Sequence, residues 1–389
     1  MLLLETDLVM PKLFIIGSRG IPAQYGGFET FVEKTSLGLV QKGLKVYVTC
    51  HGESSVYDSY HGVNRLIIKR SDNKLLYRFL NDYRAIKASM TNADKDDIFY
   101  FLGAAFLPIF YLILFPYFKK KRIKIWLNPD GFGWKRKKFP WWARLYSRIG
   151  TNVSLFFSNS IIFDSSAVKK FWLSKHPFLD DKSNVIEYGA TVNEATKTQK
   201  SELDKFLESN NLKKYKYYLI VARYAPENNF DLIIEQYLKS DLKKPFLIVS
   251  TGEPKDMYKK YGIYDDYKLK FHKPIYNQAL VGLLRKYCFC YIHGHEVGGT
   301  NPTLLEAMAS GCLIVAHDNE FNREVLGKNG IYFDKTDGSL IKAFKRVERL
   351  SENERDELKR EYVGRIVNYY NWERIIDEYY KLLLKTNIN

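Results

Sequence analysis

Short apolar runs rich in Val, Ile, Leu and aromatic residues alternate along this chain with longer amphipathic stretches. This alternation constrains the fold most, because it is typical of parallel strands that are connected and covered by helices. In the first half we predict strands at 12–17, 44–50, 98–102, 123–127 and 185–188, and a helix over 28–42. The pattern predicts a doubly wound α/β domain.

A second series of strand-like runs begins after a polar stretch at residues 194–217. We predict its strands at 218–222, 245–250, 269–271, 287–293 and 313–317, with helices between them. A chain of 389 residues is long enough for two such domains. We expect an N-terminal domain over 1–195, a C-terminal domain over 196–365, and a helical segment over 366–389 that docks back on the first domain.

Positive charge is concentrated in the first half of the chain. The net charge is +16, and residues 1–195 hold +11 of it. Eleven basic residues and a single acid, Asp130, lie between Lys119 and Arg148, interleaved with four Trp residues. A strongly basic protein implies an anionic partner: nucleic acid, an anionic membrane surface or a phosphorylated small molecule.

Residues 98–118 form a run of 21 residues without a charge, which by length alone could span a membrane. Gly103 divides the run into a strand and an apolar helix, so we predict a βαβ unit rather than a span. Trp, Lys and Arg beside an apolar helix are also what a membrane-surface face requires, because indole rings settle at headgroup depth and cations meet anionic lipid. The alternative is a solvated basic face.

Four cysteines, at positions 50, 288, 290 and 312, form neither a CxxC pair nor a spaced framework. Three of them lie in apolar runs typical of buried strands, so we expect reduced thiols and no zinc ribbon. The first ten residues lack the basic start of a signal peptide. These features predict a cytoplasmic protein.

The segment HGHEVGGTNPTLLEAMASG, residues 293–311, carries the clearest chemistry. Asn301 is a residue type that caps helix N-termini, Pro302 suits the first helical position, and Gly311 suits the C-terminal cap. A strand that ends near His293 therefore leads through a glycine-containing loop into a helix.

This loop and helix predict an anion site. Free N–H groups at Gly299, Thr300 and the first helical turn act together with the positive end of the helix dipole. They lie at the carboxyl end of a parallel strand, where open α/β sheets bind ligands. Glu306 is one turn into the helix and leans back toward its start, where a carboxylate suits a ribose diol better than a phosphate. Together these features predict a bound nucleotide.

Two acidic or histidine-rich groups resemble metal sites only superficially. His293, His295 and Glu296 lack a further spaced ligand, and the DKDD run at 94–97 precedes a strand and is typical of a solvated turn. We therefore expect neither a metal nor an organic cofactor.

Two further segments follow predicted strands. VARYAPENNFDLII, residues 221–234, ends a strand near Arg223, whose guanidinium can bind a diphosphate through two hydrogen bonds. GSRGIPAQYGGFETFVEK, residues 17–34, is a glycine-rich loop before a helix, in which Gly26 and Gly27 let the backbone approach a ligand. Its spacing is not GxGxxG, so no dinucleotide site is predicted. A surface arginine and a loop that needs positive φ are the structural alternatives.

These three segments, in this order, resemble the retaining GT-B glycosyltransferases of family 4. Together with NPDGFGWKRKKF, residues 128–139, they look like the bacterial rhamnosyltransferases that extend lipid-linked capsule or cell-wall precursors. The resemblance covers nearly the whole chain and implies a GT-B fold of two Rossmann-like domains facing a central cleft. It implies transfer of L-rhamnose from dTDP-L-rhamnose, with retention, onto a sugar carried by undecaprenyl diphosphate.

The resemblance also assigns roles to residues. Arg223 would stabilise the diphosphate leaving group, Glu306 would bind the ribose, and the loop at Gly26, Gly27 and Glu29 would shape the acceptor side. The candidate catalytic residues are Arg223, Glu296, Glu306 and Asp130. The candidate substrate-binding residues are Gly26, Gly27, Glu29, Asn128, Asn228, Gly298, Gly299, Thr300 and Asn301.

The chain departs from the family pattern at three places. The family separates its two glutamates by seven residues, whereas nine lie between Glu296 and Glu306, and position 298 is Gly. Asn228 replaces the lysine of the family's Arg and Lys pair. The turn that contains Asn128 and Asp130 stands where many members have a histidine that reaches the donor sugar.

The implied partners are a nucleotide-sugar donor, a lipid-linked saccharide and, through residues 105–148, an anionic membrane surface on the inner face of the cell membrane, with no nucleic acid. The alternatives within enzymes are transfer of another hexose from a UDP- or GDP-sugar, and a GT-B nucleotide-sugar epimerase. From other classes, a nucleic-acid binder would use the charge of +16, and an integral membrane protein would use residues 98–118 as its anchor.

Overall fold

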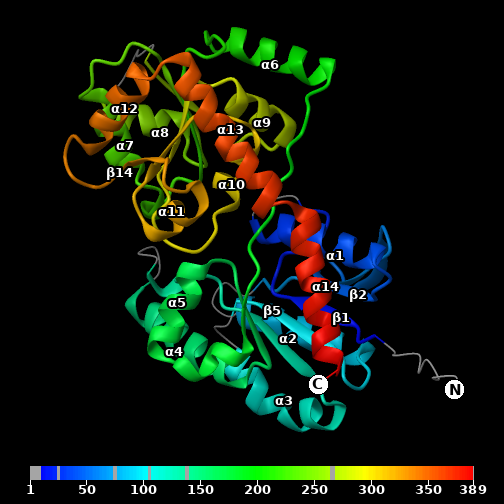
Figure 1. Cartoon of the computed structure of the whole chain (residues 1–389). Helices are drawn as coiled ribbons and strands as arrows, with labels where there is room; N and C mark the ends of the chain where they lie inside the picture. The colour runs from blue at the N-terminus through cyan, green and yellow to red at the C-terminus, as the bar shows by residue number, and fades with distance from the viewer. Residues whose placement is uncertain are drawn as a thin grey trace, which may run out of the picture. The chain divides into compact units, whose positions relative to one another are not determined.

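The computed structural model describes residues 10–23, 27–72, 77–103, 107–135, 140–262 and 268–388. The chain folds into two compact units. Unit 1 comprises residues 1–134, 141–187 and 372–389, and unit 2 comprises residues 135–140 and 188–371. Each unit is built around its own sheet (Figure 1).

Unit 1 contains an eight-stranded sheet in the order β3-β4-β2-β1-β5-β6-β7-β8, in which only the pair β3 and β4 is antiparallel. Its strands are β1 Leu13–Ile16, β2 Val46–Gly52, β3 Val56–Tyr60, β4 Val63–Lys69, β5 Ile98–Leu102, β6 Lys124–Asn128, β7 Ser160–Phe163 and β8 Ser183–Val185. Its helices are α1 Gly27–Gln41, α2 Tyr77–Asn92, α3 Leu107–Lys121, α4 Trp141–Phe157, α5 Ser166–Lys175 and α14 Trp372–Ile388, with 3-10 turns η1 Gly133–Lys135 and η2 Pro177–Lys182.

Unit 2 contains a six-stranded, fully parallel sheet in the order β11-β10-β9-β12-β13-β14. Its strands are β9 Tyr218–Val221, β10 Phe246–Val249, β11 Leu269–His272, β12 Cys290–His293, β13 Ile314–His317 and β14 Ile331–Phe333. Its helices are α6 Lys197–Ser209, α7 Phe230–Leu238, α8 Pro254–Lys260, α9 Gln278–Lys286, α10 Pro302–Ala309, α11 Glu320–Leu326, α12 Ser339–Arg349 and α13 Glu352–Tyr369, with the 3-10 turn η3 Pro226–Asn228.

The predicted α/β class with parallel sheets is confirmed. The strand predictions for 12–17, 44–50, 98–102 and 123–127 correspond to β1, β2, β5 and β6, and all five in the second series correspond to β9 to β13. The prediction for 185–188 is wrong in extent, because β8 ends at Val185. The elements β3, β4, α2, β7 and β14 are not predicted by the apolar pattern.

Both sheets contain a topological switch point. In unit 1, β1 lies between β2 and β5, and in unit 2, β9 lies between β10 and β12. The chain therefore leaves the first strand of each sheet toward one side and later returns on the other. The carboxyl ends of β1 and β5, and those of β9 and β12, border the crevices where open α/β sheets bind ligands.

The C-terminal helix α14 belongs to unit 1 and lies beside α1 (Figure 1). The Tyr379 hydroxyl lies 2.8 Å from that of Tyr100, and Lys42 pairs with Asp377 at 2.6 Å. A Cβ at Gly38 of α1 would lie 2.2 Å from Cδ1 of Ile376, so only glycine lets the two helices approach this closely.

The uncharged run at 98–118 is divided as predicted, with β5 ending at Leu102 and α3 beginning at Leu107. Gly103 between them has a φ of +95°, which favours glycine. None of the helices in the described part of the chain combines the length and apolar character that crossing a membrane requires.

Candidate functional site

The candidate residues of unit 2 gather at the carboxyl ends of β9 and β12. Arg223 and Asn228 follow β9, and Glu296 and the glycines at 298 and 299 follow β12. These two strands are neighbours in the sheet and flank its switch point. Two segments that are about 70 residues apart in sequence therefore form one site.

Backbone contact brings the two loops together. A Cβ at Gly294 would lie 2.1 Å from the backbone oxygen of Asn228, so glycine is required for this approach. The side-chain amide of Asn229 donates to the Gly294 backbone oxygen at 2.8 Å, and the Glu296 backbone N–H donates to the Glu227 backbone oxygen at 3.0 Å. The geometry of one loop thus determines that of the other.

The Asn228 side chain joins the loops rather than pointing away from them. Its Nδ2 donates to the Arg223 backbone oxygen at 2.7 Å, and its Oδ1 lies 2.8 Å from Nδ1 of His295. The side chain is buried. Asn228 therefore shapes the site through neighbouring residues, whereas a lysine at this position would bring a charge.

Glu296 is held in a polar cluster behind the loop. Its Oε2 pairs with the Lys335 ammonium and accepts a hydrogen bond from Asn229 at 3.0 Å. Burial alone would raise the pKa of Glu296, but the hydrogen bonds from Lys335 and Asn229 more than offset this effect, and the pKa is lowered. The Glu296 carboxylate is therefore ionised at neutral pH.

The start of α10 has the predicted form. Asn301 caps the helix, with its side chain accepting from the Thr303 N–H at 2.9 Å, and Pro302 is the first helical residue. Gly298 has a φ of +131°, which accounts for glycine at this position. The N–H groups of Gly298 and Gly299 make no hydrogen bond within the described residues. Donors for an anion are therefore available, and Thr300 lies buried beside them.

Glu306 has a partner that the sequence does not reveal. Nη1 of Arg285, on α9, lies 2.9 Å from Oε2 of Glu306, and the guanidinium also lies over the Tyr291 ring at 5.7 Å. The Arg285 side chain is 4% exposed and that of Glu306 is 37% exposed. Burial opposes the charge of Arg285, but the Glu306 carboxylate outweighs it and the pKa is raised. Glu306 thus neutralises a buried cation while reaching solvent.

Arg223 is an exposed cation of the site, and unlike Lys335 it has no acidic partner within the described residues. It follows β9 by two residues, and its guanidinium makes no hydrogen bond or ion pair within the described residues. Since its backbone oxygen is held by Asn228, the side chain is free to reach a ligand while its anchor stays in place. An unpaired guanidinium of this kind suits a diphosphate.

Two buried histidines end the strands next to these loops. His293 closes β12 and His317 closes β13. Burial lowers the pKa of both side chains, that of His293 well below its ordinary value, with His295 and Arg285 lowering the latter further. Both are therefore neutral near pH 7, and Nε2 of each has no hydrogen-bond partner within the described residues. No group of three or more metal-ligating side chains occurs in that part of the chain.

The unit 1 candidates border its own switch point, after β1. Gly27 opens α1, and Glu29 in the first turn accepts a hydrogen bond from the Arg19 N–H at 3.2 Å. Glu33, one turn further, accepts from the Ala23 N–H at 3.2 Å. Gly26 lies outside the described residues. The carboxylates of α1 thus hold the glycine-rich loop through its backbone.

Asn128 and Asp130 follow β6 in unit 1. Asn128 is buried and accepts a hydrogen bond from the Asp130 N–H at 2.9 Å, and Asp130 is half-buried with a φ of +52°. The predicted turn therefore exists, with Asn128 stabilising its backbone and the Asp130 side chain nearer to solvent.

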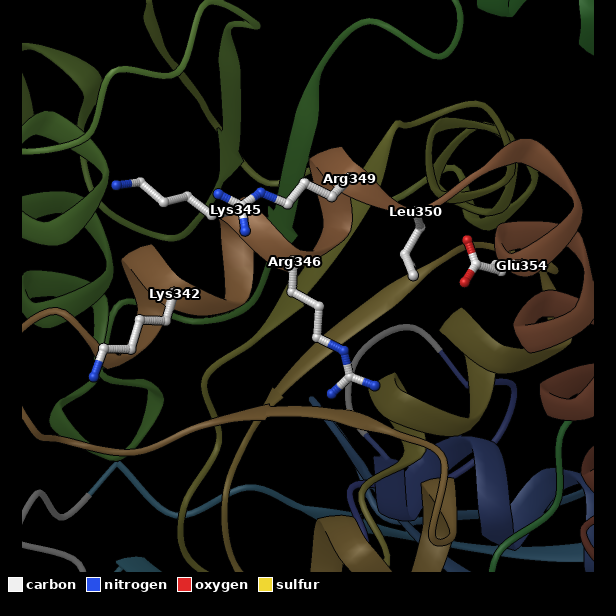
Figure 2. A pocket seen from close by; sticks show the side chains of 6 residues that line it. All are labelled: Lys342, Lys345, Arg346, Arg349, Leu350 and Glu354. Atoms are coloured by element: carbon white, nitrogen blue, oxygen red, sulfur yellow. The ribbon is translucent and has the colours of Figure 1, made fainter.

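A hollow of about 420 Å³ lies elsewhere in unit 2, against α12 and the start of α13 (Figure 2). Figure 2 shows long basic side chains around it; the lining residues are Lys342, Lys345, Arg346, Arg349, Leu350 and Glu354. None of the candidate residues lines it.

Sequence reasoning missed three participants: Arg285, Lys335 and Asn229. Arg285 lies in the last turn of α9, where a cation usually complements the helix dipole in solvent. Its only unusual signal is its place in the apolar sequence QALVGLLRKY. Asn229 adjoins a predicted residue, whereas Lys335 comes from the loop after β14, a strand that the pattern does not predict.

The two halves of the chain match different family models. Residues 203–363 match the family described as glycosyl transferases group 1. Residues 10–191 match a domain of unknown function, DUF1972. No curated protein matches the chain.

Solved structures share the fold over nearly the whole chain. Sucrose-phosphate synthase from Thermosynechococcus elongatus has a TM-score of 0.74 at 14% identity, with 96% of this chain and 98% of that chain covered. Anabaena HepE in complex with UDP has a TM-score of 0.72 at 13% identity, with 97% and 100% covered. The catalytic domain of starch synthase IV from Arabidopsis thaliana, bound to ADP and acarbose, has a TM-score of 0.73 at 14% identity, with 98% and 100% covered. Residues 203–363 therefore form a group 1 glycosyl transferase domain, in a chain that has the GT-B glycosyltransferase fold.

Proposed function

We propose that this glycosyltransferase moves a hexose from a nucleotide-sugar donor onto a lipid-linked saccharide, with retention at the anomeric carbon. The donor we favour is dTDP-L-rhamnose and the acceptor a sugar on undecaprenyl diphosphate, in capsule or cell-wall polysaccharide synthesis. The sugar and the acceptor rest on the resemblance of the sequence segments. We further propose that the reaction needs no metal or organic cofactor.

The unpaired Arg223 guanidinium after β9 and the free amides of Gly298 and Gly299 after β12 are the observations that carry the proposal. These groups lie at the switch point of unit 2, after neighbouring strands. They offer positive charge and N–H donors to a diphosphate, while Glu306 keeps Oε1 for a ribose hydroxyl because Arg285 pairs with Oε2. Of the structures that share the fold, HepE is in complex with UDP, and starch synthase IV is bound to ADP and acarbose.

The proposed reaction exchanges one bond at the anomeric carbon for another. The bond from that carbon to the diphosphate oxygen breaks, the acceptor hydroxyl oxygen forms the new bond, and its proton leaves with the diphosphate. Negative charge grows on the diphosphate as the bond breaks, so Arg223 and the amides of the β12–α10 loop stabilise the transition state more than the ground state. We nominate no protein nucleophile.

In this proposal the remaining candidates of unit 1 serve the acceptor side. Gly27 and Glu29 shape the loop after β1, and Asp130 follows β6. Glu296 stabilises the loop between β12 and α10 rather than contacting the donor, since its carboxylate already pairs with Lys335 and Asn229.

A donor panel tests the proposal directly. Purified chain is incubated with dTDP-rhamnose, UDP-glucose, UDP-galactose or GDP-mannose and a lipid-linked glucose acceptor, and the product linkage is read by NMR. We expect transfer from dTDP-rhamnose with retention. Interconversion of the donor sugar without acceptor would instead reveal an epimerase, and a product from another donor would replace rhamnose.

Arg223→Ala and Arg346→Ala form a matched pair for this assay. Both remove an exposed guanidinium from unit 2, but only Arg223 lies at the switch point, whereas Arg346 lines the hollow of Figure 2. We expect kcat to fall about 10² to 10³-fold for Arg223→Ala, the loss typical of one transition-state charge contact, and to stay unchanged for Arg346→Ala. Equal activity of the two variants would refute the role of Arg223.

A further inference from the structure

Exposed apolar side chains are unevenly distributed over the described residues. Of 22 large apolar or aromatic side chains that are exposed, half lie between residues 109 and 178. Nearly all of these are on α3 and α4, two helices that are in contact through the stacked rings of Tyr111 and Phe157, with centroids 4.2 Å apart. A large exposed apolar patch of this kind usually marks a site of interaction with another molecule or with a membrane.

On α4 the exposed apolar residues form one stripe. Trp142, Leu145, Ile149 and Phe156 follow the spacing of one helix face, and Trp141 extends it. The opposite side of the helix is buried, at Gly150, Thr151 and Ser154 among others. The apolar stripe of α4 therefore faces outward, which is the reverse of the usual pattern for a surface helix.

α3 repeats this arrangement. Ile109, Leu112 and Ile113 are exposed on one side, while Phe110 and Phe118 are buried. The exposed side ends in Lys119 and Lys120. We define the α3–α4 face by six exposed apolar residues: Leu112, Ile113, Trp141, Trp142, Leu145 and Ile149.

The charge of the two helices has a single sign. α3 carries three lysines in its last turn, α4 carries Arg144 and Arg148, and neither helix contains an Asp or a Glu. Trp141 and Trp142 are also the exposed members of the chain's six tryptophans, all of which are described. Apolar stripes, indole rings and cations thus occur together on one pair of helices.

We propose that the α3–α4 face docks on an anionic lipid bilayer. Leu112, Ile113, Leu145 and Ile149 would enter the boundary between headgroups and acyl chains, while the indole rings of Trp141 and Trp142 rest at headgroup depth. Lys119, Lys120 and Arg148 would then meet anionic headgroups.

Charge complementarity decides against the other occupants. A second copy would bring α3 and α4 against the same acid-free helices, so lysines and arginines would face each other without a counter-charge. A nucleic acid could use the cations and stack on indole rings, but it has no apolar partner for Leu112, Ile113, Leu145 and Ile149. A bilayer with anionic lipid satisfies both the apolar and the charged groups.

The proposal goes beyond the transfer reaction, because it would hold for any sugar and any lipid-linked acceptor. Its failure is therefore distinguishable from that of the proposed function. Donor binding by the chain without lipid tests the nucleotide site, and vesicle binding without donor tests the α3–α4 face.

Vesicle binding of the full-length chain provides the test. Sedimentation with vesicles of phosphatidylcholine alone is compared with vesicles that contain phosphatidylglycerol as well, at low and high NaCl concentration. We expect binding to the anionic vesicles, a weakening with salt, and a blue shift of tryptophan fluorescence on binding. Equal binding to neutral vesicles, or no binding to either, would overturn the proposal.

Two double variants address the apolar and the charged contributions. For Trp141→Ser with Trp142→Ser, we expect the partition coefficient to fall roughly tenfold or more and the fluorescence shift to disappear. For Lys119→Gln with Lys120→Gln, we expect a fall of about 25-fold, about fivefold for each cation. All of these side chains are exposed, so both variants should keep the wild-type circular dichroism and donor affinity.

Matched controls lie in unit 2. Lys342→Gln with Lys345→Gln removes the same charge from the hollow in Figure 2, and Tyr276→Ser removes a ring with an exposed fraction of 65%, against 62% for Trp142. We expect both controls to bind vesicles within twofold of wild type. A control loss as large as that of the α3–α4 variants would show diffuse attraction and overturn the proposal. So would a solution dimer that dissociates on mutation of Trp141 and Trp142, or RNA binding that depends on them.

Discussion

The two switch points of this protein are built on the same backbone device and differ in how it is supported. In unit 1, a Cβ at Gly17 after β1 would lie 2.5 Å from the Leu102 oxygen at the end of β5. In unit 2, a Cβ at Gly294 after β12 would lie 2.1 Å from the Asn228 oxygen after β9. In each unit, a glycine that follows one strand allows its backbone to contact the backbone at or after the end of the neighbouring strand.

The supporting side chains are different in kind. In unit 1, Glu29 and Glu33 accept hydrogen bonds from backbone N–H groups of the glycine-rich loop. In unit 2, the support comes from charged and polar side chains that bond to each other, such as Arg285 with Glu306 and Lys335 with Glu296. The edge of unit 2 therefore depends on the ionisation of its side chains, as expected of a site that binds a charged ligand.

The largest expected effect comes from removing Glu306. Glu306→Ala leaves the buried Arg285 cation without its counter-charge, so we expect the free energy of unfolding to fall by about 3 kcal/mol, at the low end for a buried pair because Glu306 reaches solvent. In unit 1, Glu29→Ala should cost only about 1 kcal/mol, since it removes one hydrogen bond to the Arg19 N–H. Urea denaturation measures both values.

Glu306→Gln with Arg285→Met serves as the control for that comparison, because it removes both charges and leaves none buried. We expect the double variant to be more stable than Glu306→Ala while still losing donor affinity. If Glu306→Ala and Glu29→Ala destabilise the chain equally, the difference between the two switch points is not electrostatic. Loss of activity in Glu306→Ala alone would not identify a ribose contact, since the variant also unfolds more easily.

The glycine contacts come next, and both units should be sensitive to them, with additional backbone strain at Gly17, whose φ is +110°. Gly17→Ala and Gly294→Ala each place a methyl group against a backbone oxygen, so we expect losses of about 2–3 kcal/mol in unfolding free energy. Gly43 has a φ of +85° but no atom within 4 Å of a Cβ. Gly43→Ala therefore measures the cost of backbone strain without a steric clash. A Gly294→Ala protein as stable as wild type would contradict the close approach of the two loops.

Acidification should weaken the protein through its buried histidines. The pKa values of His293 and His317 in unit 2 are lowered mainly by burial. The unfolded chain binds protons at these rings below about pH 6.5 and the folded chain does not, so stability falls as the pH drops from 6.5 toward 5. The slope is up to about 1.4 kcal/mol per pH unit for each histidine. Urea titrations across this range measure it.

His317→Asn sharpens that prediction. It removes one of the two titrating rings of unit 2, so the fall in stability between pH 6.5 and 5 should become shallower than in the wild type. An unchanged slope would mean that His317 is protonated without opening the edge of unit 2.

The smallest effect is expected at the helix caps. Asn301→Ala removes the acceptor for the Thr303 N–H, and Ser351→Ala removes the corresponding acceptor at α13, so each should cost about 1 kcal/mol of stability. Only Asn301 lies at the proposed anion site, so only Asn301→Ala should also weaken nucleotide binding. Thermal unfolding measures the loss of stability, and calorimetry with dTDP measures nucleotide affinity. Equal nucleotide affinities of the two variants would show that the Asn301 cap does not contribute to the anion site.

Much of the fold could be predicted because buried strands carry their signal locally. A strand such as β5, with all five residues buried, appears in the sequence as an uninterrupted apolar run. The hairpin of β3 and β4 could not be predicted in this way, because β3 is largely exposed and lies at the edge of its sheet. The sequence of β3 therefore lacks an uninterrupted apolar run. Residues 186–188 show the reverse error, since Ile186 and Tyr188 are buried although these residues do not join β8.

The candidate site divides in the same way. Asn301, Pro302 and the positive φ of Gly298 follow from local rules of helix capping and loop geometry, and the structure agrees with them. The pairing of Arg285 with Glu306 could not be predicted from the sequence, because 21 positions separate them and nothing local requires a buried cation on α9.

Local chemistry therefore determined the order of strands and helices, the two-sheet architecture and the residue types at each strand end. Only the tertiary structure determined that the loops after β9 and β12 are hydrogen-bonded to each other and that Glu306 pairs with a buried arginine. It also determined that the apolar stripes of α3 and α4 face outward. The physical reason is that burial and pairing depend on strand order, and strand order brings together segments that the chain keeps far apart.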